Sequence, residues 1–401
     1  MTLSLKEVVL ITDKIYPFYL GGYERRNWEL AVRLSNTVNV KVLTSLDHRS
    51  ITAGDNLTLY RVFPRLSYLN SRGYRNIVHN LAYSLGLLRF IGIRASIIDA
   101  NATPYIHLPL VYLIARLRRI PLVITCHEAL YDSIPDLVDR LFLRWPQVFR
   151  RLFVVIARGI YLQSLIHADK LVAVSAPVAR VLEQELRRPV TVIPLGVSRT
   201  GRRSSQKQVS TRGAFEIGYV GRLHPEKRVC DLITAVAKLN SESKGCINAH
   251  IIGGGPIRQD LESECVRLGA KSAVEFHGVI SEQERDKILS GLDAFAMPSA
   301  REGFSLASLE ALSFGIPVIA ALPTRGVDGI ASIVTDGVNG LLYPVGDVSK
   351  LCMCIRKLMT NRSLRLQLSE SAERASKEYQ WDRIGERLID TYEGLLELKA
   401  S

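Results

Sequence analysis

The sequence lacks the features that define several protein classes. Cysteine is scarce, since the 401 residues hold six, and Cys352-Met-Cys354 has neither a zinc nor a redox spacing. We therefore expect reduced thiols in a cytoplasmic protein rather than a disulfide scaffold. No uninterrupted apolar run reaches the ~20 residues of a membrane-spanning helix. The short apolar run at 8–12, followed by Asp13 and Lys14, does not resemble a secretory signal, so a soluble or peripheral protein is expected.

Other motifs are absent as well. The sequence has no Walker phosphate loop, no spaced dinucleotide fingerprint with a following acidic residue, no Asp-x-Asp pair and no short repeat or low-complexity tract. Apolar residues make up 47% and charged residues 23%, which is typical of a globular chain and argues against disordered and coiled-coil classes. A chain of 401 residues is longer than one hydrophobic core usually serves, so two domains are expected.

The charge is unevenly distributed along the chain. Residues 1–195 hold 25 basic and 14 acidic side chains, whereas residues 196–401 hold 27 and 25, and the whole chain carries a formal charge of +13. Many arginines of the first half stand beside large apolar residues, as in the run Phe149-Arg150-Arg151-Leu152-Phe153. Nucleic acid or an anionic membrane could each explain a basic, apolar half, and a solvated face could explain any single cluster.

Short apolar runs alternate with helical patterns along the chain, which predicts parallel sheets covered by helices on both faces. The expected strands are 8–12, 38–44, 95–99, 122–126, 171–175, 190–194, 216–220, 249–252, 274–276, 294–297, 317–321 and 333–335. Residues 198–213 hold one apolar residue in sixteen and predict a linker between two doubly wound α/β domains, 1–197 and 214–380. A final amphipathic helix at 381–398 could pack back on the first domain.

Candidate site residues follow predicted strands, because ligands of open parallel sheets bind beyond the carboxyl ends of the strands. Gly21-Gly22 precedes a helix whose free N–H groups suit a phosphate, although an ordinary strand-to-helix turn explains it equally well. Gly221 ends another strand, and the cations of Arg222 and Lys227 could converge on one anion from both sides of a turn. The alternative for this pair is two solvated charges.

Two further segments have the same position after a strand. Gly253-Gly254-Gly255-Pro256 permits close backbone approach to a flat or phosphorylated ligand. Glu302 and Glu310 lie eight residues apart, on a loop and on a helix that begins near Ser305 and whose first amides could face an anion or a sugar. The rest of that helix is apolar, so the Glu310 carboxylate should have a partner. The alternative is an ordinary loop and an exposed helix glutamate.

Together these segments resemble the retaining GT-B glycosyltransferases of family 4. The segment Glu302-Gly-Phe-Ser-Leu-Ala-Ser-Leu-Glu310 is similar to the family's E-x7-E signature, and Gly221-Arg222-Leu-His-Pro-Glu-Lys227 is similar to its G-R-L-x-x-x-K segment. The run Gly253–Pro256 resembles its glycine turn, and Gly21-Gly22 resembles its N-terminal glycine loop. Pro194-Leu195-Gly196-Val197 resembles the end of its first domain, with Leu195 in place of the usual Asn.

The resemblance implies a role for each matching residue. The N-terminal domain would bind the acceptor and the C-terminal domain a nucleotide-sugar donor, with the two sheets facing each other across a cleft. Arg222 and Lys227 would bind the donor diphosphate, and Glu310 the ribose hydroxyls. The other implied donor contacts are Gly21, Gly22, Gly254, Pro256, Val279, Ile280, Glu302, Phe304, Ser305 and Leu306, and the implied catalytic residues are Glu302, His127, Arg222 and Lys227. A purely structural role is the alternative for His127.

The resemblance also implies transfer of a hexose with retention, through an oxocarbenium-like transition state and without an enzymic nucleophile. No metal or other cofactor is expected, because Asp-x-Asp is absent and the two cations can take a metal's part. The basic half becomes the acceptor half, which favours a lipid-linked or glycan acceptor at an anionic membrane, with 137–165 as the contact segment. The alternative is a degenerate transferase fold that binds nucleic acid or another anionic surface; the intact site residues argue against it, and no nucleic acid partner is expected.

Overall fold

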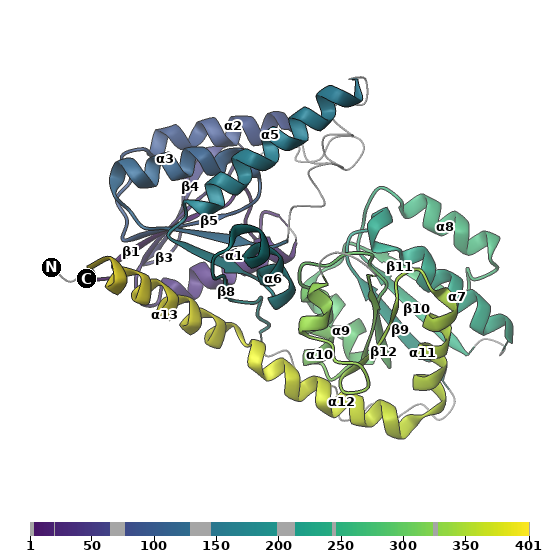
Figure 1. The fold of residues 1–401 in the computed structure, drawn as a ribbon. Helices are drawn as coiled ribbons and strands as arrows, with labels where there is room; N and C mark the ends of the chain where they lie inside the picture. Colours follow the sequence, from purple (N-terminus) through teal and green to yellow (C-terminus); the bar gives the residue numbers. More distant parts are fainter. Residues whose placement is uncertain are drawn as a thin grey trace. The chain divides into compact units, whose positions relative to one another are not determined.

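The computed structural model describes residues 4–19, 21–64, 77–128, 146–198, 213–242, 246–323 and 328–400. The chain forms two compact units (Figure 1). The first unit consists of Met1–Leu195 together with Trp381–Ser401, and the second of Gly196–Gln380. The expected linker at 198–213 lies outside the described residues except for its first and last positions.

The first unit is built on a sheet in the order β3-β4-β2-β1-β5-β6-β7-β8. Its strands are β1 (Glu7–Ile11), β2 (Asn39–Ser45), β3 (Ser50–Gly54), β4 (Leu57–Phe63), β5 (Ile97–Asn101), β6 (Leu122–Cys126), β7 (Lys170–Ala173) and β8 (Thr191–Val192). Its described α-helices are α1 (Gly22–Leu34), α2 (Ile77–Gly86), α3 (Leu108–Arg118), α5 (Gln147–Ile166), α6 (Ala176–Leu186) and α13 (Trp381–Ala400). In Figure 1, α2, α3 and α5 lie above this sheet and α13 lies below it.

The second unit is built on a sheet in the order β11-β10-β9-β12-β13-β14, and all of its neighbouring strands run parallel. Its strands are β9 (Phe215–Val220), β10 (Ile247–Ile252), β11 (Val274–Gly278), β12 (Ala294–Met297), β13 (Val318–Leu322) and β14 (Gly340–Pro344). Its described α-helices are α7 (Val229–Glu242), α8 (Arg258–Arg267), α9 (Glu282–Gly291), α10 (Leu306–Ser313), α11 (Val348–Thr360) and α12 (Arg362–Ser376).

Burial explains why short apolar runs form the central strands. Every residue of β6 and of β12 is buried, as expected for parallel strands covered by helices on both faces. The strand order reverses between β1 and β5 in the first sheet and between β9 and β12 in the second. In sheets of this type, ligands bind beyond the carboxyl ends of the strands at such a reversal, so these two edges are where functional residues are expected.

The fold differs from the sequence prediction in two places. The predicted strand 333–335 is wrong, since these residues form no strand after the 3-10 helix Gly329–Ser332. One edge strand of the sheet is instead the unpredicted β14. Ile333 and Val334 are buried, so the sequence shows an apolar run typical of a strand. The chain then turns at Gly337, whose φ is 70°, and only afterwards does β14 pair with β13. The first sheet is also not purely parallel, because the unpredicted β3 and β4 pair antiparallel and carry no long buried run.

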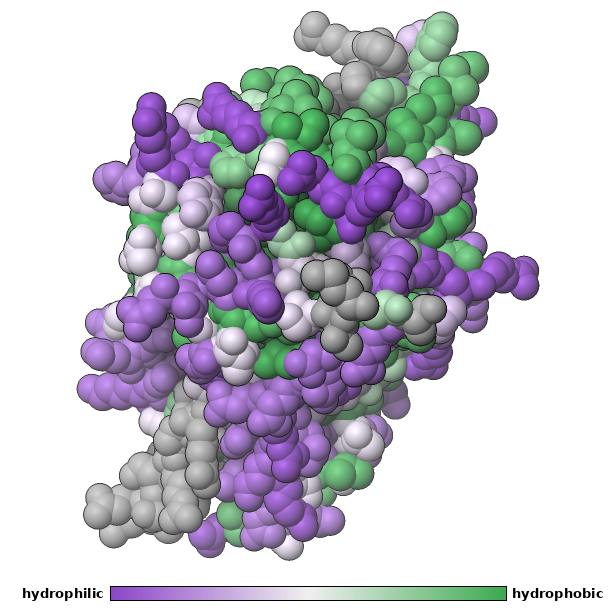
Figure 2. All heavy atoms as spheres, turned by 90° about the vertical axis from the view of Figure 1, so that its left-hand side faces the viewer, coloured by the Kyte–Doolittle hydropathy of each residue, from purple (hydrophilic) through white to green (hydrophobic). Residues whose placement is uncertain are grey.

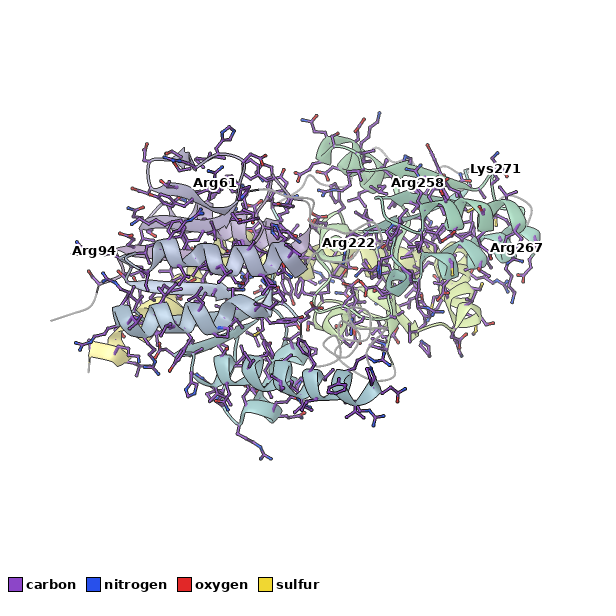
Figure 3. All side chains as sticks on the ribbon, turned by 90° about the horizontal axis from the view of Figure 1, so that it is seen from above. Arg61, Arg94, Arg222, Arg258, Arg267 and Lys271 are labelled. Atoms are coloured by element: carbon purple, nitrogen blue, oxygen red, sulfur yellow. The ribbon has the colours of Figure 1, made fainter. Side chains whose placement is uncertain are left out.

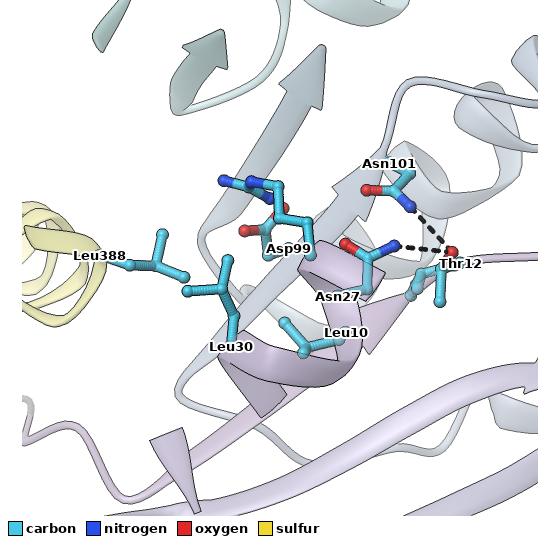
Figure 4. A pocket seen from close by; sticks show the side chains of 9 residues that line it. Leu10, Thr12, Asn27, Leu30, Asp99, Asn101 and Leu388 are labelled. Atoms are coloured by element: carbon cyan, nitrogen blue, oxygen red, sulfur yellow. Dashed lines mark hydrogen bonds between the residues drawn. The ribbon is translucent and has the colours of Figure 1, made fainter. Parts of the chain in front are cut away.

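The last helix of the chain is fixed to the first unit by a buried hydrogen bond. The Tyr392 hydroxyl of α13 donates to Asp99 Oδ2 at 2.6 Å, and Thr125 Oγ1 donates to Asp99 Oδ1 at 2.9 Å. Burial raises the pKa of the Asp99 carboxyl, while the two hydroxyl donors and the charge of Arg26 oppose that rise. Leu388 of α13 lines a small internal pocket together with Asp99 (Figure 4). The C-terminal residues therefore complete the core of the first unit.

We expect Tyr392→Phe to lower the free energy of unfolding of the first unit by about 1–3 kcal/mol, because Asp99 then loses a donor inside the core. Urea unfolding followed by circular dichroism measures the change. Tyr60→Phe is the matched control, since the Tyr60 ring packs on Phe90 and lies outside the Asp99 network. Equal unfolding midpoints for the two variants would contradict this interpretation.

Candidate active site

The loop after β9 presents the two predicted cations. A Cβ on Gly221 would lie 2.5 Å from the Tyr219 hydroxyl, which donates to the backbone oxygen of Arg222 at 3.0 Å, so the turn requires glycine. The loop then forms a 3-10 turn at Pro225–Lys227. Lys227 Nζ pairs with Glu302 Oε1 at 2.8 Å, and both side chains are mostly buried, 16% and 13% exposed. The ammonium is thus held in place by a carboxylate 75 residues away in the sequence.

Arg222 is the exposed member of the pair. Its side chain is 59% exposed, and its guanidinium lies 3.7 Å from Glu226 Oε1. With this exposure and a partner 3.7 Å away, the guanidinium is accessible to an anion from solvent. In Figure 3, Arg222 lies on the opposite side of the second unit from Arg267 and Lys271, so the charges of that far side are separate from this site.

The glycine turn after β10 packs backbone to backbone against the loop after β9. The φ of Gly253 is 130°, and a Cβ there would lie 2.0 Å from the Gly221 oxygen. A Cβ on Gly255 would lie 2.2 Å from the Leu223 oxygen, and the Leu223 amide donates to the Gly254 oxygen at 2.8 Å. These glycines therefore allow the backbones of the two loops to come into contact, and they would also allow a ligand to come close to the backbone.

The predicted base-contact residues follow β11. This strand ends at Gly278, whose φ is 70°. Val279 comes next and is 68% exposed, and a Cβ on Gly254 would lie 3.2 Å from its side chain. Ile280 lines a surface pocket beside α9. The turns after β10 and β11 are thus neighbours at one edge of the sheet.

Glu302 lies after β12, and its backbone pairs with that of a second acidic residue. Glu302 and Asp328 form a parallel backbone bridge, and the Gly329 amide donates to the backbone oxygen of Glu302 at 2.8 Å. A Cβ on Gly329 would lie 1.9 Å from the Gly303 oxygen, so the two backbones are in close contact. Burial raises the pKa of Asp328 to about 6, against the amides of Ala331 and Ile330 that lower it, and the charge of Glu302 adds to the rise. Asp328 was not predicted from the sequence.

Helix α10 begins one residue after its cap, Ser305, whose hydroxyl accepts from the Ser308 amide at 3.3 Å. Phe304, just before the cap, is buried and packs against Tyr379 with the ring centroids 6.0 Å apart. Leu306 is the first residue of the helix, so the predicted helix start is correct to one residue. The amides of this first turn lie directly after Glu302, as predicted.

The predicted partner of Glu310 exists. Glu310 is buried on α10, and its Oε1 lies 3.5 Å from a guanidinium nitrogen of Arg285, which comes from α9. Burial acts to lower the pKa of Arg285, but the charges of Glu310 and Asp286 outweigh it and hold the pKa above its usual value. Arg285 therefore stays charged beside Glu310 in the second unit.

The first unit brings its predicted residues to the switch point beside β1. Helix α1 begins at Gly22, and Gly21 is its N-cap residue. A Cβ added to Gly21 would lie 2.1 Å from a Glu24 carboxylate oxygen. Glu24 Oε1 lies 3.8 Å from the ammonium of Lys14, and both side chains are buried. This ion pair was missed, although Lys14 closely follows the first strand, the position from which the other candidates were chosen.

His127 is positioned by a chain of amide hydrogen bonds. Asn27 and Asn101 each donate to Thr12 Oγ1, at 3.0 and 2.8 Å (Figure 4). The Asn101 oxygen then lies 3.1 Å from His127 Nε2. Because the Asn101 nitrogen is used as a donor to Thr12, its oxygen accepts, and the histidine carries its hydrogen on Nε2. The ring also lies 5.4 Å from the Tyr23 ring, centroid to centroid. A polar-contact role and a structural role both fit this arrangement.

Two family models match consecutive stretches of the chain. Residues 20–200 match the family described as glycosyltransferase family 4, and residues 202–375 match the family described as glycosyl transferases group 1. The chain belongs to the group 1 glycosyltransferases. The family inferred from the motifs is therefore confirmed, while the retaining mechanism stays a prediction.

Curated relatives of this group 1 chain include glycosyltransferases of archaea and bacteria. An uncharacterized glycosyltransferase of Methanocaldococcus jannaschii is 29% identical over 230 residues, which are 57% of this chain and 60% of the relative. The D-inositol 3-phosphate glycosyltransferase of Corynebacterium urealyticum is 32% identical over 185 residues, 45% of this chain and 43% of the relative. The chain thus matches 43–60% of the length of these two proteins.

Solved structures resemble the group 1 chain over nearly its whole length. Sucrose-phosphate synthase from Thermosynechococcus elongatus has a TM-score of 0.78 at 18% identity, over 99% of this chain and 100% of that one. Anabaena HepE in complex with UDP and glucose has a TM-score of 0.71 at 19% identity, over 97% and 100%. WaaG, of lipopolysaccharide biosynthesis, has a TM-score of 0.70 at 18% identity, over 96% and 99%. The GT-B fold with two Rossmann-like α/β units is confirmed.

We expect Gly253→Ala to destabilise the second unit by about 2–4 kcal/mol, because both the positive φ and the neighbouring backbone oxygen exclude a side chain. Gly254→Ala is the matched control, since its Cβ would meet only the side chain of Val279, at 3.2 Å. Thermal unfolding of both variants measures the difference. If the Gly253→Ala protein were as stable as the Gly254→Ala protein, the loops after β9 and β10 would not be in close backbone contact.

Proposed function

We propose that this protein transfers a hexose from a nucleotide-sugar to a hydroxyl acceptor with retention and without a metal ion. The observation that carries the proposal is the Lys227–Glu302 pair at 2.8 Å, at the carboxyl edge of the second sheet and beside the exposed guanidinium of Arg222. A diphosphate is the ligand that matches two cations on one loop. Complexes of HepE with UDP and with UDP-glucose support a donor of this class.

In the proposed reaction the bond between the anomeric carbon and the donor diphosphate breaks. The acceptor hydroxyl oxygen bonds to that carbon on the same face, and its proton passes to the departing phosphate oxygen. Negative charge develops on the leaving phosphate, so Lys227 and Arg222 stabilise the transition state more than the ground state. Glu302 would hold Lys227 in place and contact the sugar hydroxyls, and Glu310 would hold the ribose.

Donor selectivity tests this proposal directly. We expect one of UDP-, GDP- or ADP-hexoses to raise the melting temperature of the second unit without magnesium, since a ligand at a hundredfold over its Kd stabilises a fold by about 2.7 kcal/mol. Glu310→Gln should lose that shift, whereas Glu262→Gln on α8 should keep it.

Lys227→Ala should bind the donor but turn over on the order of a hundredfold more slowly, with Lys271→Ala as its control. No shift with any donor, or a shift only with magnesium, would refute the proposal.

We also propose a membrane-associated acceptor, lipid-linked or glycan. The support is an exposed apolar and basic surface on α2, α3 and α5, where Figure 2 shows apolar side chains gathered in its upper part. The exposed apolar residues of α5 are Val148, Phe149, Leu152, Phe153, Val155, Ile156, Ile160 and Ile166. Arg151 on α5 and Arg118 on α3 are exposed as well. None of the helices in the described residues combines the length and the apolar content needed to cross a bilayer. Residues 137–145 of the predicted contact segment lie outside the described residues.

We expect the protein to sediment with vesicles that contain phosphatidylglycerol, and less with phosphatidylcholine vesicles or at high salt, because both apolar burial and charge contribute to surface binding. Leu152→Glu with Ile156→Glu should reduce the bound fraction at least tenfold. Leu366→Glu on α12 places the same charge on another exposed leucine and should change nothing. Equal binding to neutral and anionic vesicles, or full binding by the double variant, would exclude this surface.

A further inference from the structure

A histidine cluster lies on β10 and β11, outside the donor residues discussed above. His250 on β10 pairs in register with Glu275 on β11, and His277 follows two residues later on the same strand. His250 Nδ1 lies 3.0 Å from His277 Nε2 and 3.7 Å from Glu275 Oε2. One ligand atom from each of the three residues lies within 4.8 Å of the others. Two imidazoles and a carboxylate lie together on the edge strand and its neighbour, with Glu275 Oε1 also 3.6 Å from His277 Nδ1.

These distances fit a tetrahedral metal ion. With metal–nitrogen bonds of about 2.0–2.1 Å, two imidazole nitrogens on one ion lie about 3.3 Å apart. The observed 3.0 Å therefore needs a displacement of only a few tenths of an ångström. The Glu275 side chain is 68% exposed, so its carboxylate can move toward the nitrogens without disturbing the core. Two histidines with one glutamate are a ligand set that zinc accepts, with a fourth position left for water.

A second carboxylate orients the first histidine. Glu216 Oε2 on β9 lies 2.9 Å from His250 Nε2, and Asn248 donates to Glu216 Oε1 at 3.1 Å. Because a carboxylate accepts, His250 carries its hydrogen on Nε2 and points the lone pair of Nδ1 at the cluster. A carboxylate on the far nitrogen is the arrangement that fixes and strengthens metal-bound histidines. This contact is independent of the three candidate ligands and points to the same kind of ligand.

The second histidine is suited to bind as a neutral ring. Burial lowers the pKa of His277, against the charge of Glu275, which raises it, and His250 lowers it further. The site is also reachable, since the His250 and His277 side chains are 22% and 15% exposed and line the surface pocket beside α9. The charged groups that share this pocket are Glu216, Glu284 and Lys287. Together with Glu275, the carboxylates outnumber the lysine, which favours a cation.

We propose that His250 Nδ1, His277 Nε2 and the Glu275 carboxylate bind one divalent transition-metal ion of the zinc class, with Glu216 as the positioning residue. The ion would join β10 to β11, the two strands whose exits carry the glycine turn and the Val279–Ile280 segment. Its role would be structural or regulatory, because Lys227, Glu302 and Glu310 are not among its ligands. The proposal does not depend on the proposed donor or reaction.

The test uses the full chain after treatment with a chelator and its removal. Calorimetric titration with Zn²⁺ should give one ion per chain, and Co²⁺ should give the visible absorption of a tetrahedral nitrogen–oxygen site. Thermal unfolding should shift upward with Zn²⁺ and not with Mg²⁺. Affinity should fall as the pH is lowered through the titration of the histidines, because protonated rings cannot ligate.

Matched variants assign the ligands. Glu216→Gln should weaken Zn²⁺ binding by about 10–100-fold, and His277→Ala and His250→Ala by at least as much. His277→Gln keeps a polar side chain in case the alanine variant folds poorly, and far-ultraviolet circular dichroism checks each fold. His48→Ala removes an exposed histidine of the first unit and should bind Zn²⁺ like the parent chain. The proposal is overturned if no ion binds, or if a folded His277 variant binds Zn²⁺ as tightly as the parent.

Discussion

Strand direction is the constraint on which the second unit depends. Because its neighbouring strands all run parallel, the loops that follow β9, β10 and β12 leave the sheet at one edge. Residues far apart in the sequence meet there as a result, and Lys227 reaches Glu302 across 75 positions. The charges at this edge are paired within the protein, Lys227 with Glu302 and Glu310 with Arg285. Pairing offsets the cost of keeping such groups charged while they are largely buried.

Glycine makes this convergence possible. At Gly253, Gly255 and Gly329 a side chain would collide with the backbone oxygen of a neighbouring loop. The loops consequently touch through their main chains, and the functional side chains project from a rigid base. Contact between loops therefore explains why glycines recur at the strand exits of this unit. Contact with a ligand alone would require glycine at fewer of these positions.

Much of this arrangement could be predicted from the sequence, because strand ends and fixed spacings are local signals. The apolar helix around Glu310 indicated that its carboxylate needs a partner. The sequence did not indicate that this partner is Arg285, because Arg285 lies on another helix at no fixed spacing from Glu310. Asp328 reaches Glu302 through a bridge that no periodicity marks. The histidine cluster did leave a signal, because polar residues alternate along β10 and β11, yet only the register of the two strands brings His250 beside Glu275. Tertiary pairing, rather than local propensity, decides these contacts.

The return of α13 to the first unit has a consequence for the order of synthesis. Residues 1–195 leave the ribosome long before Trp381–Ser401, and in between the chain must form the entire second unit. The hydroxyl that Asp99 requires is added only with Tyr392, after the whole of the second unit has been synthesised. The first unit is therefore the last to complete its core, although its sheet is made first. A nascent chain that stalls or is cut before Tyr392 would carry a finished second unit and an unfinished first one.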